Sequence, residues 1–235
     1  VVQGGYKTYR RLVTRALYQD PLPHRFVQLG GYTGTAKTAL LPRLAARGVQ
    51  VIDLEGLARH RGSLLGDMPG GQPSQKWFET CLAQELSRLD PGRPVLVEAE
   101  SSKIGQILLP PSLWEGMKQA PWIEVTAPLD ARAVYLDAAY DDILSDGARL
   151  KAQLAPLRYH RGHALIDQWE ALIDAGERLA LCRSLAADHY DPAYEKSMSA
   201  MTPRVLQRFE TPTLDAAGLD ALADRIAEAF QTMEI

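Results

Sequence analysis

The residues with the clearest chemical purpose form a short turn between an apolar run and a helical segment. The turn consists mainly of small residues and ends in a lysine and a threonine. The residues of interest are Gly31, Thr33, Gly34, Thr35, Ala36, Lys37 and Thr38. A strand, a glycine-rich turn and a helix that carries Lys-Thr are typical of a P-loop, in which backbone N–H groups and a helix N-terminus hold phosphate. Lys37 is predicted to contact the outer phosphates, and Thr38 a magnesium ion. The alternative is an ordinary turn that only caps a helix.

One position departs from the usual P-loop pattern. Ala36 stands where G-x-x-x-x-G-K-[ST] has a glycine. If this position needs a positive φ, alanine costs about 1 kcal/mol. If the position is already helical, alanine is harmless. The sequence leaves both alternatives open.

The rest of the chain alternates predicted strands and helices, which is typical of a parallel sheet covered by helices. The predicted strands are 25–29, 50–54, 94–98, 122–126 and 205–209, and one helix is predicted over 130–144. From 146 to about 187 the periodicity is helical only. We therefore expect an α/β fold of the P-loop NTPase type with a helical insert. The expected segments are a linker region over 1–20, the α/β domain over 21–145 and 205–235, and the insert over 146–204.

Carboxylates follow the second and third predicted strands. Asp53 and Glu55 come at the end of the second strand, and Glu98 ends the third, with Glu100 two residues later. Ligands bind at the carboxyl ends of strands in open α/β sheets. Glu98 and Glu100 are predicted to hold magnesium through water or to orient a nucleophile, and Asp53 is a weaker candidate metal ligand. The alternative is that these carboxylates only bond to neighbouring loops.

The loop after the second predicted strand carries two arginines. Arg59 and Arg61 are predicted to bind phosphate, because the guanidinium group suits two-pronged contacts with this anion. His60, between them, is predicted to make local hydrogen bonds rather than to act as a general base. A helix is predicted to begin after the N-cap Ser74, with Trp77 and Phe78 in its apolar stripe.

Two basic segments indicate a polyanionic partner, although the net charge of the chain is −3. One lies on a helical face near the start, and the other runs from 149 to 163 without a carboxylate. The predicted contacts are Lys7, Arg10, Arg11 and Arg15 in the first segment, and Arg149, Lys151, Arg158 and Arg161 in the second. For either segment alone a solvated helix face is the alternative, and the presence of both beside a phosphate loop favours a polyanion.

Composition limits the class of protein. A chain of 235 residues with 46% hydrophobic and 23% charged residues is ordinary globular material. No apolar run reaches membrane-spanning length, and the first residues lack the plan of a signal peptide, so a cytoplasmic protein without a membrane partner is predicted. Cys81 and Cys182 have no metal-ligand spacing and are predicted to be core residues.

Six sequence blocks together have a recognisable pattern. They are Gly4-Gly5-Tyr6-Lys7-x-Tyr9-Arg10, Thr33-Gly34-x-x-Lys37-Thr38, Asp53-Leu54-Glu55-Gly56-Leu57-Ala58-x-His60-Arg61-Gly62-Ser63, Pro73-Ser74-Gln75-Lys76-x-Phe78-Glu79, Val97-Glu98-x-Glu100-Ser101-x-x-Ile104-Gly105 and Tyr190-Asp191-x-x-Tyr194-x-x-Ser197. This set resembles the bacterial tRNA 2-selenouridine synthase family, which joins an N-terminal rhodanese domain to a C-terminal P-loop domain. The match covers nearly the whole chain, with the first block resembling the end of the rhodanese module. The resemblance thus implies a P-loop domain without its rhodanese module.

The resemblance implies a role in tRNA modification. The family replaces the sulfur of wobble 2-thiouridine in tRNA with selenium from selenophosphate, through an S-geranylated uridine made from geranyl diphosphate. Selenation is assigned to a cysteine of the rhodanese domain, and neither cysteine of this chain lies in a rhodanese loop. The expected ligands of the P-loop are therefore geranyl diphosphate, or ATP or GTP, with magnesium. The expected partners are tRNA and the rhodanese domain.

Three residues near the end of the predicted insert are candidates for tRNA contact. Tyr190, Tyr194 and Lys196 could line the mouth of the site or stack on a base, as is common in recognition of single-stranded RNA. Packing of the two tyrosines is the alternative. For the chain as a whole, a geranyl-transfer and tRNA-binding domain, a nucleotide-binding kinase-like or regulatory module, and a scaffold for the rhodanese domain all remain open.

Overall fold

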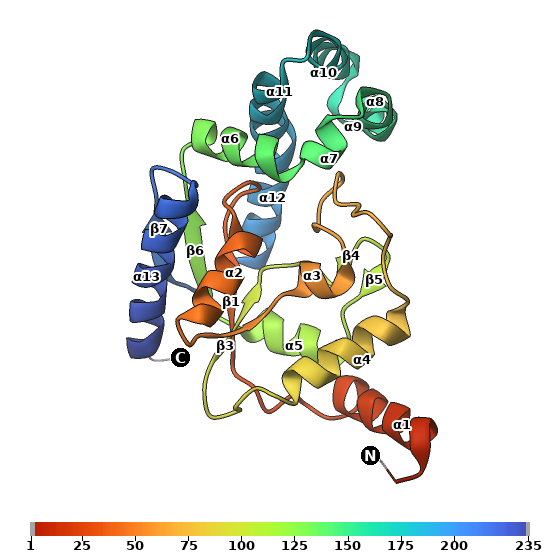
Figure 1. Cartoon of the computed structure of the whole chain (residues 1–235), viewed down its shortest axis with the longest axis vertical. Helices are drawn as coiled ribbons and strands as arrows, with labels where there is room; N and C mark the ends of the chain where they lie inside the picture. Colours follow the sequence, from red (N-terminus) through yellow and green to blue (C-terminus); the bar gives the residue numbers. More distant parts are fainter. Residues whose placement is uncertain (1–2, 234–235) are drawn as a thin grey trace.

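Five short apolar strands form the centre of the molecule, and helices cover both faces of the sheet (Figure 1). The computed structural model describes residues 3–233; residues 1–2 and 234–235, which belong to the first and last predicted segments, lie outside the described residues. All neighbouring strands run parallel, in the order β2-β3-β1-β6-β7. The expected α/β sheet with flanking helices is confirmed.

The elements have the following bounds. In chain order they are α1 (Gly5–Tyr18), β1 (Phe26–Gly30), α2 (Lys37–Ala46), β2 (Gln50–Ile52), α3 (Leu54–Ala58), α4 (Gln75–Leu86), β3 (Val95–Glu98), β4 (Lys103–Ile104), β5 (Ile107–Leu108), α5 (Pro111–Gln119), β6 (Trp122–Thr126), α6 (Leu129–Ala139), α7 (Asp141–Leu144), α8 (Gly147–Leu154), the 3₁₀ turn η1 (Ala155–Leu157), α9 (Arg158–Arg161), α10 (His163–Ala175), α11 (Arg178–Ser184), the π-helical turn η2 (Leu185–Tyr190), α12 (Asp191–Met201), β7 (Val205–Glu210) and α13 (Ala216–Thr232). β4 and β5 form a separate antiparallel pair.

Alternation of side chains along the strands divides the core into two layers. Val27 and Leu29 of β1 pack on the face that α2 and α13 cover, together with Leu96 of β3. Val95 and Val97 of β3 pack on the opposite face, which α1, α4 and α5 cover. All five residues of β1 are buried, as expected of a central parallel strand that is enclosed on both faces.

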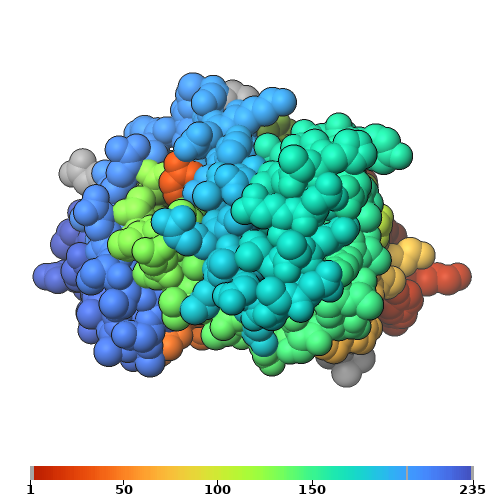
Figure 2. All heavy atoms as spheres, turned by 90° about the horizontal axis from the view of Figure 1, so that it is seen from above, coloured from red at the N-terminus to blue at the C-terminus, as the bar shows by residue number. Residues whose placement is uncertain are grey.

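A third apolar cluster holds the helical insert together. It joins Leu136 of α6 to residues of the later helices, including Ile166 and Trp169 of α10 and Leu181 of α11. The single helix expected over 130–144 is two helices, because α6 ends at Ala139 and α7 begins at Asp141. Helices α8 to α11 of the insert lie beyond the carboxyl ends of the strands, whereas α12 lies level with α2 and β6 (Figure 1); seen from above, the insert covers much of that end (Figure 2).

Three further details differ from the sequence expectations or refine them. Trp77 is 62% exposed whereas Phe78 is fully buried, because successive helix positions lie about 100° apart and do not share a face. The prediction of Trp77 as a core residue was therefore wrong. Cys182 is buried and Cys81 is partly buried. Within residues 3–233, no helix is both long and apolar enough to cross a membrane.

The turn between β1 and α2 is packed closely against α6. A Cβ atom on Gly34 would lie 2.9 Å from Leu136 Cγ and 3.2 Å from the Arg132 carbonyl oxygen, at a φ of +85°. Gly48 has a similar φ of +82°, but a Cβ atom there would meet nothing within 4 Å. Alanine substitutions at these two positions therefore distinguish the cost of a positive φ from the cost of steric overlap between the new Cβ atom and α6.

We expect Gly34→Ala to lower the free energy of unfolding by about 1–3 kcal/mol more than Gly48→Ala does. Both alanines bear the cost of a positive φ, and only the first also collides with α6. Urea denaturation of the two variants and the wild type measures the difference. Equal losses in the two variants would show that α6 does not pack on the turn.

Candidate functional site

The predicted P-loop connects the carboxyl end of β1 to the first residue of α2. Helix α2 begins at Lys37, so its first N–H groups have no partner within the helix and face the turn. Ala36 adopts φ 60° and ψ 29°, which is the left-handed region. This answers the question that the sequence left open: the position needs a positive φ, and alanine bears a cost of about 1 kcal/mol there.

Lys37 lies inside the turn. Its Nζ atom donates hydrogen bonds to the carbonyl oxygens of Gly31 at 2.7 Å and of Tyr32 at 3.2 Å. Burial lowers the pKa of Lys37, while the nearby carboxylates of Glu55 and Glu100 act in the opposite direction. An ammonium group has three donors, so one proton remains for a ligand after these two bonds.

Thr38 lies between two carboxyl groups. Its hydroxyl oxygen is 2.6 Å from Glu55 Oε2 and 2.8 Å from Glu98 Oε1. A hydroxyl group has one proton to donate, so one of the two carboxyl groups must donate to it in return. Glu98 is the better donor, because burial raises its pKa well above the usual value and the neighbouring Glu55 raises it further.

Glu55 and Glu100 form a second carboxyl pair beside the first. They share a hydrogen bond, and burial is the main reason why the pKa of Glu100 rises to about 8. Burial also raises the pKa of Glu55. The sequence placed Glu55 at a strand end without indicating a role for it, whereas Asp53 was a weaker candidate metal ligand. In the structure Asp53 caps α3 by accepting a hydrogen bond from the Gly56 N–H at 2.6 Å.

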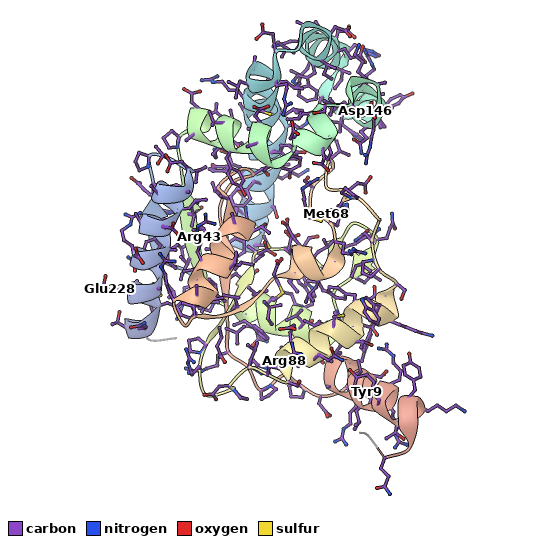
Figure 3. All side chains as sticks on the ribbon, in the orientation of Figure 1. Tyr9, Arg43, Met68, Arg88, Asp146 and Glu228 are labelled. Carbon is purple, nitrogen blue, oxygen red and sulfur yellow. The ribbon has the colours of Figure 1, made fainter. Side chains whose placement is uncertain are left out.

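A cavity of about 520 Å³ opens on the P-loop. The polar part of its lining includes Lys37, Thr38, Glu55 and Glu100. The apolar and aromatic part includes Leu64, Met68, Leu136, Ala139, Tyr140, Tyr190 and Ala193. Met68 lies on the loop between α3 and α4, below the insert that Asp146 introduces (Figure 3). The cavity thus brings a phosphate-binding turn and an apolar wall together.

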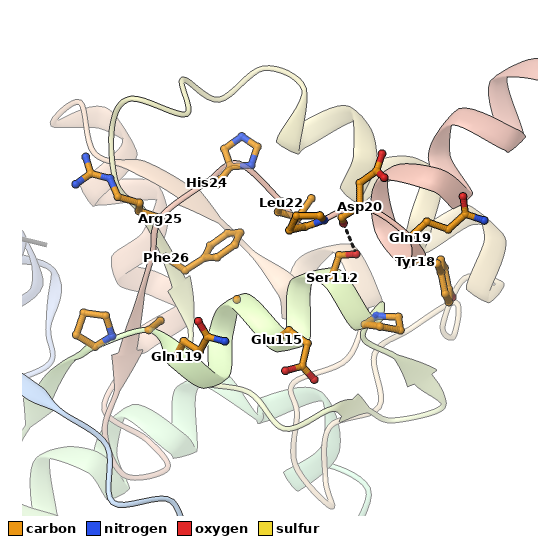
Figure 4. Close-up of a pocket in the computed structure, with 15 residues that line it drawn as sticks. Tyr18, Gln19, Asp20, Leu22, His24, Arg25, Phe26, Ser112, Glu115 and Gln119 are labelled. Carbon is orange, nitrogen blue, oxygen red and sulfur yellow. Dashed lines mark hydrogen bonds between the residues drawn. The ribbon is translucent and has the colours of Figure 1, made fainter.

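A second hollow, of about 580 Å³, lies between the C-terminal end of α1 and α5. Figure 4 shows His24, Phe26, Ser112 and Glu115 around it. It lies where β1 begins, whereas the P-loop lies where β1 ends. Its lining includes none of the residues predicted to bind phosphate.

The two predicted phosphate-binding arginines have different positions. Arg61 lines the cavity, donates to Asp142 Oδ1 at 2.9 Å and lies 5.0 Å from the centre of the Tyr140 ring. Arg59 ends α3 in a left-handed conformation and is exposed outside the cavity lining. The structure therefore brings Arg61 to the P-loop cavity and leaves Arg59 away from it.

The four basic residues of α1, Lys7, Arg10, Arg11 and Arg15, line one hollow of the surface. Arg10 also pairs with the buried Glu79 of α4. Lys7 and Arg11 are exposed. Arg15 pairs with Asp20 at 2.8 Å.

Acidic residues from elsewhere in the chain lie against three of the four basic residues of the second segment, and His189 lies against the fourth. The contacts are Arg149 with Asp67, Lys151 with Asp174, Arg158 with Asp167 and Glu170, and Arg161 with His189. Residues 149–163 contain no carboxylate in the sequence, but carboxylates from other segments lie close to most of their basic side chains in the folded chain. Tyr190 and Tyr194 line the P-loop cavity, and Lys196 is exposed on α12. Contact of any of these residues with tRNA stays a prediction.

The fold and the site together define a P-loop protein: a parallel sheet, a Lys-Thr turn after its central strand, and an acidic residue at the end of the adjacent strand. A family model described as "tRNA 2-selenouridine synthase AAA domain" matches residues 24–155. The chain belongs to the tRNA 2-selenouridine synthase family, which confirms the resemblance seen in the sequence blocks.

Individual relatives agree with this assignment. The chain is 33% identical over 238 residues to the tRNA 2-selenouridine synthase of Hahella chejuensis, covering 88% of this chain and 61% of that protein. It is 34% identical over 256 residues to that of Cupriavidus pinatubonensis, covering 96% and 67%. The chain thus spans about three fifths to two thirds of the length of these curated relatives.

Among solved structures, TT1252 from Thermus thermophilus is similar, with 17% identity, a TM-score of 0.42 and coverage of 90% of this chain and 99% of that one. This likeness is loose, and the description of the fold rests on the strand order of the chain itself.

The carboxyl cluster predicts how stability depends on pH. Between about 4.5 and about 8, folded Glu100 keeps a proton that the unfolded chain releases. The folded state then binds more protons, so the free energy of unfolding falls as pH rises through this window. We expect Glu100→Gln to make this fall shallower by up to about 1.4 kcal/mol per pH unit.

Urea denaturation at several pH values in a chelating buffer measures this slope. Glu115→Gln, at a carboxylate that is 59% exposed on α5, is the matched control and should keep the wild-type slope. Parallel curves for Glu100→Gln and the wild type would contradict a protonated Glu100 in the folded protein.

Proposed function

We propose that this chain acts in tRNA 2-selenouridine synthesis as a P-loop domain that binds geranyl diphosphate and supports geranyl transfer to wobble 2-thiouridine. The observation that carries the proposal is the composition of one cavity. Its lining combines Lys37 and the N-terminus of α2 with an apolar part that includes Leu136 and Tyr190. A diphosphate joined to a hydrocarbon chain matches both parts of this lining.

Charge development explains how these groups would promote the reaction. The allylic carbon–oxygen bond breaks, diphosphate leaves with the electron pair, and the uridine sulfur forms the new bond to carbon. The remaining proton of Lys37 Nζ and the N–H groups at the start of α2 would stabilise the negative charge on the departing diphosphate. Glu100 faces the cavity and, when deprotonated, would accept the proton that the uridine N3 loses.

Magnesium is part of this proposal. The Thr38 hydroxyl and the carboxyl groups of Glu55 and Glu98 form an all-oxygen donor set, which suits this cation. Within the described residues, no group of three or more His, Cys, Asp or Glu side chains forms a metal site. Phosphate oxygens and water would therefore complete the coordination, and the bound cation would help to neutralise the leaving diphosphate.

Transfer of selenium from selenophosphate is assigned to a rhodanese domain as partner, not to the thiols of this chain. Burial raises the pKa of Cys182 to about 12, which disfavours the reactive thiolate. For tRNA, the exposed Lys7 and Arg11 of α1 and two tyrosines of the cavity lining, Tyr190 and Tyr194, are the proposed contacts. A cytoplasmic location stays a prediction.

A nucleotide-binding kinase-like or regulatory module is the second candidate. The same turn and the same Thr38–Glu98 contact would suit the phosphates of ATP or GTP with magnesium. The apolar wall favours the prenyl donor, because a hydrocarbon chain gains more from it than a ribose does.

Incubation of the chain with geranyl diphosphate, magnesium and tRNA that contains 2-thiouridine tests the proposal. We expect S-geranylated uridine, detected by mass spectrometry of digested tRNA. Lys37→Ala should lower the rate by about 100-fold or more, because it removes a preorganised charge from the leaving group. Lys118→Ala, at an exposed lysine of α5, is the control and should keep the wild-type rate.

The opposite outcome also has a clear meaning. The absence of geranylated product, together with a large rise in melting temperature on addition of ATP or GTP with magnesium, would reject geranyl transfer and favour the nucleotide-binding module.

A further inference from the structure

The P-loop is in contact with one face of α12. Asp191, Tyr194 and Glu195 are spaced i, i+3 and i+4, which places them on the same side of the helix. The Gly31 N–H donates to Tyr194 Oη at 3.0 Å, and Tyr32 Oη donates to Glu195 Oε1 at 3.0 Å. The contact is therefore made by specific polar groups at successive residues of the turn.

Arg132 of α6 joins this contact. Its side chain is 5% exposed, and its two Nη atoms donate to the two carboxylate oxygens of Asp191 at 2.8 and 2.7 Å. Nη1 also donates to the Thr33 carbonyl oxygen at 3.1 Å, and the guanidinium carbon lies 5.1 Å from the centre of the Tyr32 ring. One buried side chain thus links α6, α12 and the turn.

The energetics of this pair point to a role beyond stability. A buried ion pair often contributes little net stability, because the loss of hydration offsets the attraction between the charges. The Nε atom of Arg132 is also buried and has no hydrogen-bond partner among the described residues. An apolar side chain of similar volume could fill this space, but it could not hold the Thr33 carbonyl in place.

The turn needs support of this kind. Ala36 is held in the left-handed region, and a strained residue persists only where its surroundings determine its conformation. Without outside contacts, a turn of small residues would relax and its N–H groups would no longer converge. The contacts with Gly31, Tyr32 and Thr33 restrain the half of the turn that precedes Ala36.

We infer that Arg132 is a positioning residue of the P-loop: held by Asp191 of α12, it fixes the Thr33 carbonyl and the Tyr32 ring so that the turn is shaped for a diphosphate before the ligand arrives. The inference rests on the proposed function only in the identity of the anion. It also makes α12 part of the phosphate site, although α12 lies far from the turn in the sequence.

Arg132→Lys tests this inference, because lysine keeps the charge but cannot make the two-pronged contact. Arg178→Lys is the matched control. Arg178 also binds an aspartate of α6, because its Nε atom lies 2.6 Å from Asp137 Oδ1. This pair does not touch the turn. Hydrogen exchange of the amides of residues 31–38 in the free chain is the first readout. We expect faster exchange in Arg132→Lys than in Arg178→Lys.

Calorimetric binding of inorganic pyrophosphate with magnesium is the second readout. Arg132→Lys should weaken binding by about tenfold or more, and Arg178→Lys should bind as the wild type does. Asp191→Asn, which keeps the shape and one acceptor oxygen, should show the same trend if Arg132→Lys does not fold.

The inference would be overturned if Arg132→Lys and Arg178→Lys had equal exchange rates and equal affinities. The same holds if Asp191→Asn has to replace Arg132→Lys. The proposed function would remain intact in either case. Failure of the wild type to bind pyrophosphate would instead reject the proposed function and, with it, a turn shaped for a diphosphate.

Discussion

The molecule depends on one constraint: the turn after β1 must leave the N–H groups at the start of α2 free for a ligand while the interior of the turn is filled. Lys37 provides the filling, since its ammonium group is bonded to the Gly31 and Tyr32 carbonyl oxygens. Ala36 provides the sharp change of direction at a conformational cost that glycine would avoid. Close packing of α6 on Gly34 leaves the turn little room to relax. The phosphate site is thus stabilised from outside as much as by its own sequence.

The charges in the cavity follow from this arrangement. A buried ammonium group needs negative partners, and Glu55, Glu98 and Glu100 supply them from two adjacent parallel strand ends. Burial raises the pKa of all three carboxyl groups, that of Glu100 to about 8, and repulsion from neighbouring carboxylates adds to the effect. A cation that enters with a phosphate ligand would displace a proton held in this way. The site is therefore suited to an anion and a cation that bind together.

Local features of this fold could be predicted from the sequence, and features that depend on distant contacts could not. The turn, the strand positions and the apolar periodicity of the insert are local patterns, and the structure has them close to where the sequence indicated. Arg132 carried no signal, because its partners Thr33 and Asp191 are 99 and 59 residues away. The carboxylates that lie beside the basic segment after residue 149 could not be predicted for the same reason, since they belong to other segments. Glu55 could have been assigned a role, because it follows a strand adjacent to β3.

A crystal structure of the chain with geranyl diphosphate and magnesium tests the central claim most directly. The account predicts density for the diphosphate within about 2.7–3.2 Å of Lys37 Nζ and of the N–H groups at the start of α2, with the hydrocarbon chain against Leu136 and Tyr190. Density in the hollow beside His24, or a turn that stays closed by Lys37 with no ligand in the cavity, would contradict it.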